Sequence, residues 1–239
     1  MVPHSEDEVR RIRKAYTEYA GNPEVAVKWD PRNPGNRAIV REREERIQEL
    51  LRVHGFWPLE PLHILDVGCG TGGMLAQLES WGAKPENLAG IDLIPERVAR
   101  AQELYPHLHF ICGNAEEMDF PQATFDLVAA FTVFSSILDG QMAQAVARRI
   151  WWVMRPGGAV LWYDFRYDNP NNPNVRGVKL LKIRHLFPGA LPHLELVTLL
   201  PPLARRLGSL TPVLYPLLAR IPLLCTHYLG LLLKPRVQE

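Results

Sequence analysis

Hydrophobic positions in the middle of the chain form two alternating patterns. Short apolar runs bounded by turn residues predict buried strands, and five of them follow one another, at residues 63–67, 87–93, 108–112, 125–131 and 159–165. Between them, apolar residues recur every three to four positions. This spacing predicts amphipathic helices, at residues 73–81, 95–105 and 139–154. Strands that alternate with helices are typical of a parallel, doubly wound α/β sheet.

The two ends of the chain follow other patterns. Ser5 and Glu8 form a capping-box pattern at the start of a helix that Gly21–Pro23 ends. A turn-rich loop at 29–36 precedes a second helix, expected from about residue 37 to residue 53. After residue 168 we expect an Asn/Pro loop, a basic amphipathic segment, a sixth strand, a Leu/Pro-rich stretch and a final strand, at 169–174, 176–184, 194–200, 201–222 and 226–233.

A glycine-rich turn follows the first strand of the core. Gly68, Gly70, Gly72 and Gly73 fall within six residues, and a helical pattern begins at Met74. Glycine permits positive φ and lets the backbone approach a ligand without a Cβ atom in between. The N–H groups at the start of the helix favour an anionic group. Because a plain strand-to-helix turn requires only one or two glycines, we predict a ligand-binding loop.

Three further motifs give this loop a family. The sequence Asp66-Val-Gly-Cys-Gly-Thr-Gly72, with Asp92 ending the next strand, resembles the class I S-adenosylmethionine (SAM)-dependent methyltransferases. Gly113–Met118 after the third strand and Met154–Gly158 before the fifth fit the same family in order and spacing. A dinucleotide oxidoreductase more usually carries G-x-G-x-x-G, whereas this loop reads G-x-G-x-G.

The resemblance implies a fold and a division of the chain. The expected fold is α/β and Rossmann-like, with a doubly wound, mostly parallel seven-stranded sheet, a last antiparallel strand and helices on both faces. Residues 1–60 would form an N-terminal helical cap or lid over SAM and acceptor. Residues 61–239 would form the methyltransferase domain, in which 166–224 carry substrate-side inserts.

The resemblance also implies SAM as cofactor, with S-adenosylhomocysteine as product. Asp66 would lie near the methionine amino group, and Asp92 would accept hydrogen bonds from the ribose hydroxyls. Asn114 stands where an acid is often found and would accept from the adenine amino group. The full set of expected cofactor-binding residues is Tyr16, Asp66, Gly68, Cys69, Gly70, Gly72, Asp92, Leu93, Asn114, Ala115 and Phe131.

The acceptor side is less specified. If the acceptor is a hydroxyl, a general base helps, and Asp164 and His185 are the candidates; an ion-paired or loop-bonding Asp164 and a solvated His185 are the structural alternatives. The lid offers Tyr19 and Trp29 as acceptor contacts. Arg166 and Arg176 would clamp a carboxylate or phosphate, unless they are only solvated.

Charge separates the two halves of the chain, whose net charge is +1. Residues 1–160 carry a net charge of −5 and residues 161–239 a net charge of +6. The basic C-terminal part, with its long apolar runs, suggests an anionic acceptor with an apolar body or an anionic lipid surface, unless it only faces solvent. The longest charge-free runs are shorter than the ~20 residues of a membrane span, so we expect peripheral membrane contact at most.

Other features of the sequence argue against several classes of function. Three cysteines without a C-x-x-C pair predict neither a disulfide framework nor a metal site. The sequence lacks the basic stripe with interleaved aromatic residues that would indicate nucleic-acid binding. It begins without an apolar leader, and we therefore expect a cytoplasmic location. The expected function is methyl transfer from SAM to a small molecule: a secondary metabolite, glycan or lipid-linked intermediate. The alternatives are a non-catalytic SAM-binding or membrane-peripheral module and a nucleotide-cofactor oxidoreductase.

Overall fold

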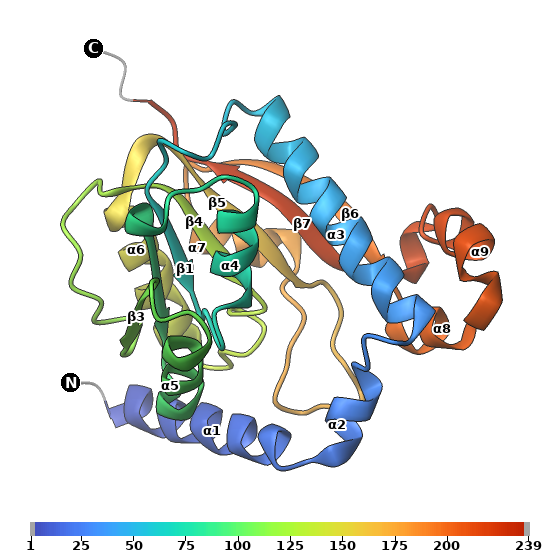
Figure 1. The fold of residues 1–239 in the computed structure, drawn as a ribbon. Coiled ribbons are helices and arrows are strands. Elements are labelled where there is room, and N and C mark those ends of the chain that lie inside the picture. The colour runs from blue at the N-terminus through green and yellow to red at the C-terminus, as the bar shows by residue number, and fades with distance from the viewer. Residues whose placement is uncertain (1–2, 237–239) are drawn as a thin grey trace.

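The computed structural model describes residues 3–236 and contains the expected seven-stranded sheet, in the order β3-β2-β1-β4-β5-β7-β6 (Figure 1). Strand β7 is antiparallel to both of its neighbours, and the remaining neighbours pair in parallel. The strands are β1 (Ile64–Val67), β2 (Leu88–Asp92), β3 (His109–Cys112), β4 (Phe125–Phe131), β5 (Met154–Phe165), β6 (Leu191–Leu199) and β7 (Cys225–Leu233). The predicted mostly parallel α/β sheet is confirmed.

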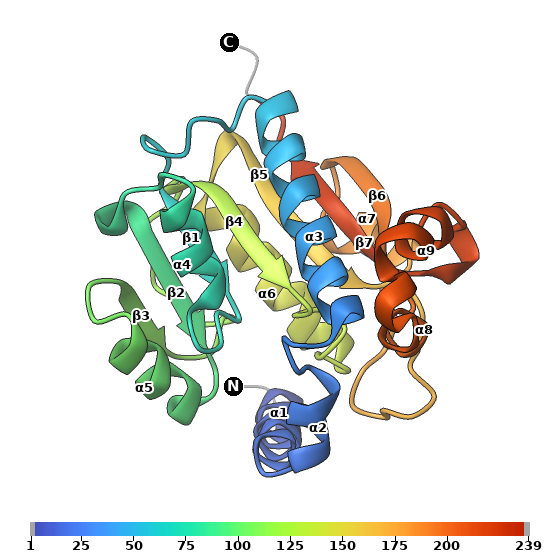
Figure 2. The ribbon, with the colours of Figure 1, turned by 45° about the vertical axis from the view of Figure 1, so that its right-hand side comes forward.

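Helices cover both faces of the sheet (Figure 2). One face packs on α3, α4 and α5 and the other on α6 and α7, while α1 lies across the ends at which β2 and β4 terminate. The helices around the sheet are α1 (Pro3–Ala20), α2 (Pro23–Lys28), α3 (Pro34–Val53), α4 (Gly73–Ser80), η1 (Pro85–Asn87), α5 (Pro95–Leu104), α6 (Gly140–Val153) and α7 (Leu180–Leu186).

The continuous apolar strands divide their side chains between two cores. Alternate residues of a strand point to opposite faces, so Ile64 and Leu127 pack towards α3, α4 and α5. Their neighbours Leu65 and Val128 pack towards α6 and α7. All four side chains are fully buried. The sheet is therefore covered on both sides, as the uninterrupted apolar runs predict.

The N-terminal segment differs from the sequence prediction. Helix α1 already includes Pro3, so the N-cap predicted at Ser5 is wrong; proline suits a first turn because its missing N–H would have no helical partner. A short helix, α2, fills part of the segment between the two predicted helices. The side chain of Asn33 then accepts from Gly35 N at 2.8 Å, and this cap starts α3 three residues before the predicted position.

The motif before the fifth strand also differs. Residues 155–158 were expected to form the turn that ends the preceding helix, but β5 begins at Met154, directly after α6. The backbone of this motif is paired with the end of β7: Gly157 N donates to Lys234 O at 2.9 Å, and Lys234 N donates to Gly158 O at 2.8 Å. A register shift against β4 between Phe125 and Leu127 accommodates the glycines.

The Leu/Pro-rich stretch forms an insert of short helices between β6 and β7. It comprises α8 (Pro201–Arg206), η2 (Gly208–Leu210), α9 (Thr211–Leu218) and η3 (Pro222–Leu224). Ala204 and Tyr215 of the insert pack with Ile39 of α3 in a small core of their own. Figures 1 and 2 show the insert beyond α3, at the edge of the molecule.

This packing predicts a strict size limit at Gly35. A Cβ atom there would overlap the backbone carbonyl of Ala204, so α8 would have to move away from α3. We expect Gly35→Ala to lower the free energy of unfolding by roughly 1–3 kcal/mol, the usual cost of overpacking. Chemical denaturation measures this. Gly21→Ala is the matched control, because a Cβ at Gly21 would meet its nearest atom at 3.6 Å; an equal loss in both variants would contradict the prediction.

Candidate active site

A cavity of about 290 Å³ lies where β1, β2 and β4 end. Its floor is the glycine loop after β1, its sides are the residues that follow β2, β3 and β4, and Ile12 and Tyr16 of α1 line its roof. In open α/β sheets, ligands bind in this position, beyond the carboxyl ends of the strands where the chain order reverses. Here the reversal falls at β1, which lies between β2 and β4.

The glycine loop has the backbone conformation that its sequence predicts. Gly68, Gly70 and Gly72 adopt φ values of 73°, 55° and 84°, a region that side-chain-bearing residues rarely occupy. Gly68 N and Cys69 N both donate to Ile91 O, at 2.8 and 3.1 Å, which holds the loop against β2. Gly72 is the N-cap of α4 and does not line the cavity, whereas Gly68, Cys69 and Gly70 do.

Asp92 fixes the loop from the end of β2. Its Oδ2 accepts from Gly70 N at 2.8 Å and its Oδ1 accepts from Ile94 N at 2.9 Å. Only 5% of the residue is exposed, and this part faces the cavity. A carboxylate offers about four acceptor positions, so Asp92 can hold the loop and still accept hydrogen bonds from a ligand.

Asp66 lies beneath the loop rather than in the cavity wall. The residue is 2% exposed. Burial, with the nearby carboxylate of Asp92, raises the pKa of Asp66 to about 8. The side chain is therefore largely protonated at neutral pH, and a cation placed near it would favour its ionised form.

Asn114 and Ala115 follow β3 and line the side of the cavity, as Leu93 does after β2. The Asn114 amide is already oriented: its Oδ1 accepts from Glu116 N at 3.1 Å and its Nδ2 donates to Glu116 Oε2 at 2.8 Å. The side chain is thus fixed at the cavity edge, where its oxygen retains a further acceptor position.

The roof of the cavity is held by side chains of α1. Tyr16 Oη lies 3.1 Å from Ser136 Oγ, and burial raises the pKa of Tyr16. The guanidinium carbon of Arg97 lies 4.9 Å from the centre of the Tyr16 ring. Phe131, at the end of β4, also lines the cavity and forms a T-shaped contact with Tyr163. The cavity lining thus includes two aromatic rings, a residue type that attracts cations.

Sequence reasoning missed several residues of this cavity. Arg97 lies in the first turn of α5, and its place just after Asp92 was the available signal. Ser136 belongs to the loop after β4. Thr132 and Val133 of the same loop lie in the stretch 131–134 that the strand-end rule indicates, and Thr132 adopts a φ of 55°, a strained value for a β-branched residue. The apolar lining residues that sequence reasoning also missed include Ile12, Ile137, Met142 and Val146.

Asp164 is fully buried behind the loop that follows β4. Its Oδ2 accepts from Ser135 N at 3.0 Å and its Oδ1 accepts from Phe165 N at 2.8 Å. Burial raises its pKa to about 6, although these hydrogen bonds act in the opposite direction. The residue does not line the cavity. In this structure Asp164 therefore holds the loop after β4 through Ser135 N.

The other predicted acceptor-side residues lie outside this cavity. Tyr19 donates to Asn172 Oδ1 at 2.8 Å, and Trp29 is 52% exposed beside Arg205. Arg166 donates to Pro222 O at 2.8 Å, and Arg176 is exposed. His185 lies on α7 with its Nε2 2.8 Å from Gln144 Nε2. None of these five side chains lines the cavity.

Residues 3–236 contain no candidate metal site. In that part of the chain, no three His, Cys, Asp or Glu side chains gather into a group that could hold a metal ion.

Known proteins share this architecture. Residues 64–158 match the model of a methyltransferase domain family. A 24-methylenesterol C-methyltransferase of Oryza sativa subsp. japonica is 30% identical over 159 residues, which are 60% of this chain and 41% of that protein. A demethylmenaquinone methyltransferase of Chlorobaculum parvum is 33% identical over 126 residues, 52% of this chain and 49% of that protein. The chain thus spans about half the length of the curated relatives it matches.

Solved structures agree on the fold. The 1,6-didemethyltoxoflavin-N1-methyltransferase of Burkholderia thailandensis, solved with S-adenosylhomocysteine, aligns with a TM-score of 0.62 and 19% identity over 98% of this chain and 91% of that chain. A SAM-dependent methyltransferase of Methanosarcina mazei aligns with a TM-score of 0.58 and 17% identity, over 77% and 97%. With the glycine loop and Asp92 in place at the switch point of the sheet, residues 64–158 match a methyltransferase domain, and the chain shares the fold of SAM-dependent methyltransferases.

Proposed function

We propose that this protein transfers a methyl group from SAM to a small apolar acceptor by in-line displacement. The observation that carries the proposal is the cavity at the switch point of the sheet, whose floor is the glycine loop and whose side presents the Asp92 carboxylate. The family of the domain supports the same reaction.

The cavity residues fit SAM. The positive φ values at Gly68 and Gly70 leave a backbone surface without Cβ atoms for the methionine part. Asp92 is placed to accept from ribose hydroxyls, and Leu93, Asn114 and Ala115 form the side on which adenine would lie. The buried carboxyl of Asp66 beneath the loop would balance the methionine ammonium group.

Alignment is the main contribution of the chain to such a reaction. When bound, SAM supplies a methyl group on a positively charged sulfur. Tyr16 and Phe131 present aromatic rings to the cavity and would favour that charge, and α1 would exclude water as a lid. Holding an acceptor in line is worth several kcal/mol through proximity alone.

The cavity offers few side chains that could accept a proton from an acceptor. Among the described residues that line the cavity, Asp92 is the only Asp, Glu or His, and the loop amides already occupy it. We therefore propose that Asp164 acts as a positioning residue that fixes the loop after β4, and that His185 takes no part. An acceptor that ionises readily, or a carbon nucleophile, suits this arrangement best.

The lining of the cavity indicates the class of acceptor. Ile12, Val133, Ile137, Met142 and Val146 make the wall beyond Phe131 apolar. Three relatives are named for apolar acceptors: the two above and a phthiotriol/phenolphthiotriol dimycocerosates methyltransferase of Mycobacterium leprae, 28% identical over 68% of this chain and 56% of that protein. We infer that the acceptor is a polycyclic, quinone-like or long-chain molecule.

Cationic side chains outside the cavity are candidates for binding an anionic end of the acceptor. Burial lowers the pKa of Lys182, Asp164 acts in the opposite direction, and Arg176 lowers this pKa further. Arg176 is exposed, and we propose it as the group that holds an anionic end of the acceptor. Arg166 is the weaker candidate, because backbone carbonyls already engage it.

An apolar acceptor also implies peripheral contact with a membrane. The three free cysteines suit a reducing, cytoplasmic location.

A transfer assay tests the proposal. The purified protein would be incubated with SAM carrying a labelled methyl group and a panel of acceptors: a demethylated naphthoquinol, a sterol, a long-chain phenol and a soluble aromatic acid. We expect label in at least one of the three apolar acceptors. Tight SAM binding by calorimetry with no transfer to any acceptor would instead indicate a non-catalytic SAM-binding module.

The Asp92 carboxylate provides a sharper test of cofactor binding. Asp92→Asn keeps the size of the side chain but removes its charge and one acceptor group. We expect SAM affinity to fall by roughly 1.5–3 kcal/mol, the scale of hydrogen bonds to a charged group, as measured by calorimetry at a temperature at which the variant is fully folded. The melting temperature should fall as well, because the amide nitrogen of Asn cannot accept from Gly70 N or Ile94 N. Asp119→Asn, at an exposed carboxylate four residues after the cavity residue Ala115, is the matched control. Equal affinities in the two variants would contradict the assignment.

The raised pKa of Asp66 predicts that SAM binding releases a proton. With a pKa of about 8, Asp66 holds its proton at about pH 7 in the free protein. A methionine ammonium nearby would lower this pKa, so binding should expel up to about one proton and should tighten as pH rises towards 8. Calorimetry in buffers of different ionisation enthalpy measures the release. Asp66→Asn should abolish it, and proton release that persists in this variant would assign it to another group.

A further inference from the structure

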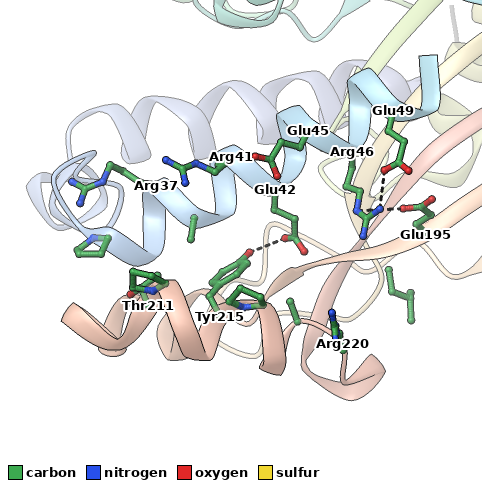
Figure 3. Close-up of a pocket in the computed structure, with 16 residues that line it drawn as sticks. Arg37, Arg41, Glu42, Glu45, Arg46, Glu49, Glu195, Thr211, Tyr215 and Arg220 are labelled. Atoms are coloured by element: carbon green, nitrogen blue, oxygen red, sulfur yellow. Dashed lines mark hydrogen bonds and ion pairs between the residues drawn. The ribbon is translucent and has the colours of Figure 1, made fainter. Parts of the chain in front are cut away.

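The insert between β6 and β7 has one face that the rest of the molecule does not cover. We call residues 200–224 the β6–β7 insert. Its inner side packs on the first half of α3, and there Glu42 Oε2 accepts from Tyr215 Oη at 2.7 Å and from Thr198 N at 2.9 Å (Figure 3). This inner side borders a groove of about 620 Å³ in which α3 supplies both acids and bases. The orientation of α9 is therefore fixed.

The outer side of α9 is apolar. Thr211 and Tyr215 are buried on the inner side, whereas Leu210, Val213 and Leu217, spaced three and four residues apart, are 58%, 65% and 55% exposed. A surface helix normally turns polar residues to water. Two exposed side chains of the following turn extend the apolar surface. We call the set the apolar tip: Leu210, Val213, Leu217, Ile221 and Leu223.

Cations accompany this apolar tip. Arg206 and Arg220 are exposed on the β6–β7 insert, and no Asp or Glu occurs anywhere between Leu196 and Gln238. The groove on the inner side of α9 is lined by acids of α3 and β6, among them Glu42, Glu45 and Glu195, and also by Arg220 (Figure 3). The insert itself thus adds only positive charge to its aliphatic side chains, and its exposed cations are Arg206 and, at the border of the groove, Arg220.

This combination suits the surface of an anionic bilayer. An apolar helix face with flanking arginines can lie in the plane of the headgroups, its aliphatic side chains at the acyl boundary and its cations on lipid phosphates. Among the described residues, no helix could cross a membrane, so such contact would be peripheral. The tip is aliphatic, whereas the centre of a protein interface is enriched in aromatic residues, which favours lipid over a protein partner.

We propose that the β6–β7 insert docks this protein on an anionic phospholipid surface through the apolar tip, with Arg206 and Arg220 on the headgroups. The proposal deepens the proposed function, on which it rests for its purpose, since docking would bring the site to a membrane-dissolved acceptor. The binding event itself requires neither SAM nor acceptor, and can therefore be tested alone.

Vesicle flotation of the full chain tests the docking. Vesicles of phosphatidylcholine alone are compared with vesicles that also contain phosphatidylglycerol, at low and at high salt and without SAM. We expect flotation that depends on phosphatidylglycerol and weakens with salt. Arg206→Gln/Arg220→Gln should weaken binding by roughly tenfold or more, given the usual contribution of each cation near an anionic surface.

The apolar tip has a matched control on the same molecule. Val213→Asp/Leu217→Asp should abolish flotation with melting temperature and SAM affinity unchanged. Val53→Asp/Leu181→Asp places the same charges at apolar positions that are 74% and 80% exposed elsewhere, and it should float like the unmodified protein. Equal loss in both double variants would overturn the proposal, because the effect would then come from added charge rather than from the tip.

Three further outcomes separate the alternatives. Absence of flotation on both kinds of vesicle overturns the docking, even if methyl transfer to a detergent-dissolved acceptor succeeds. Flotation without any methyl transfer overturns the proposed function and leaves the docking in place. A dimer in sedimentation that Val213→Asp/Leu217→Asp converts to monomer, without flotation of the unmodified protein, would instead assign the tip to a second copy of this chain.

Discussion

The hydrogen bonds between the Asp92 carboxylate and two backbone amides are the interaction on which the site depends. Burying a carboxylate costs several kcal/mol unless donors satisfy it, and here Gly70 N and Ile94 N do so. The same two bonds join the loop after β1 to the turn after β2, so the floor and one side of the cavity are positioned by one side chain. The positive φ values of the loop glycines let those amides point at the carboxylate. Ligand recognition and local stability thus rely on the same atoms.

Two further carboxylates, those of Asp164 and Glu8, hold the loop after β4. Asp164 accepts from Ser135 N on one side of the loop after β4, and Glu8 of α1 accepts from Leu138 N at 2.6 Å on the other. Burial raises the pKa of Glu8, but Arg11 and the loop amides outweigh this and lower it, so Glu8 is an anion at neutral pH. Because Arg11 also donates to Ser136 O, α1, which forms the roof of the cavity, is attached to the loop after β4 at two points. Movement of α1 would therefore change the shape of the cavity as well as open it.

Local sequence pattern accounts for the sheet and for the cofactor half of the site. Each strand is an apolar run, and the ligand-facing residues lie at fixed offsets from strand ends, so Gly68, Asp92 and Asn114 could be placed from the sequence together with the family resemblance. The acceptor half depends on tertiary contacts that no local pattern carries. Asp164 was a candidate base because it ends a strand, but the register of β5 with β4 places it behind Ser135. Arg97 reaches the cavity from α5 with its guanidinium over the Tyr16 ring of α1, a contact between segments far apart in the chain. Arg166 donates instead to backbone carbonyls of a segment more than fifty residues away.

The apolar residues near the C-terminus are a second case in which tertiary contacts, rather than local sequence pattern, determine what the side chains do. Two roles were open from the sequence for the leucines of 194–224: covering the apolar part of an acceptor, or only burying the last two strands. None of them lines the described cavity. Part of the set fills the small core with α3, and part lies on the outer face of the insert. The water-exposed aliphatic side chains of Leu210, Val213 and Leu217 lower solubility without adding to the core, so they do not stabilise the isolated chain. The tight contact of Gly35 with α8 and the Glu42–Tyr215 hydrogen bond hold this face outward. Rigid presentation of an apolar face beside cations, on an insert separate from the cofactor cavity, is the arrangement expected if docking and chemistry are distinct tasks of one chain.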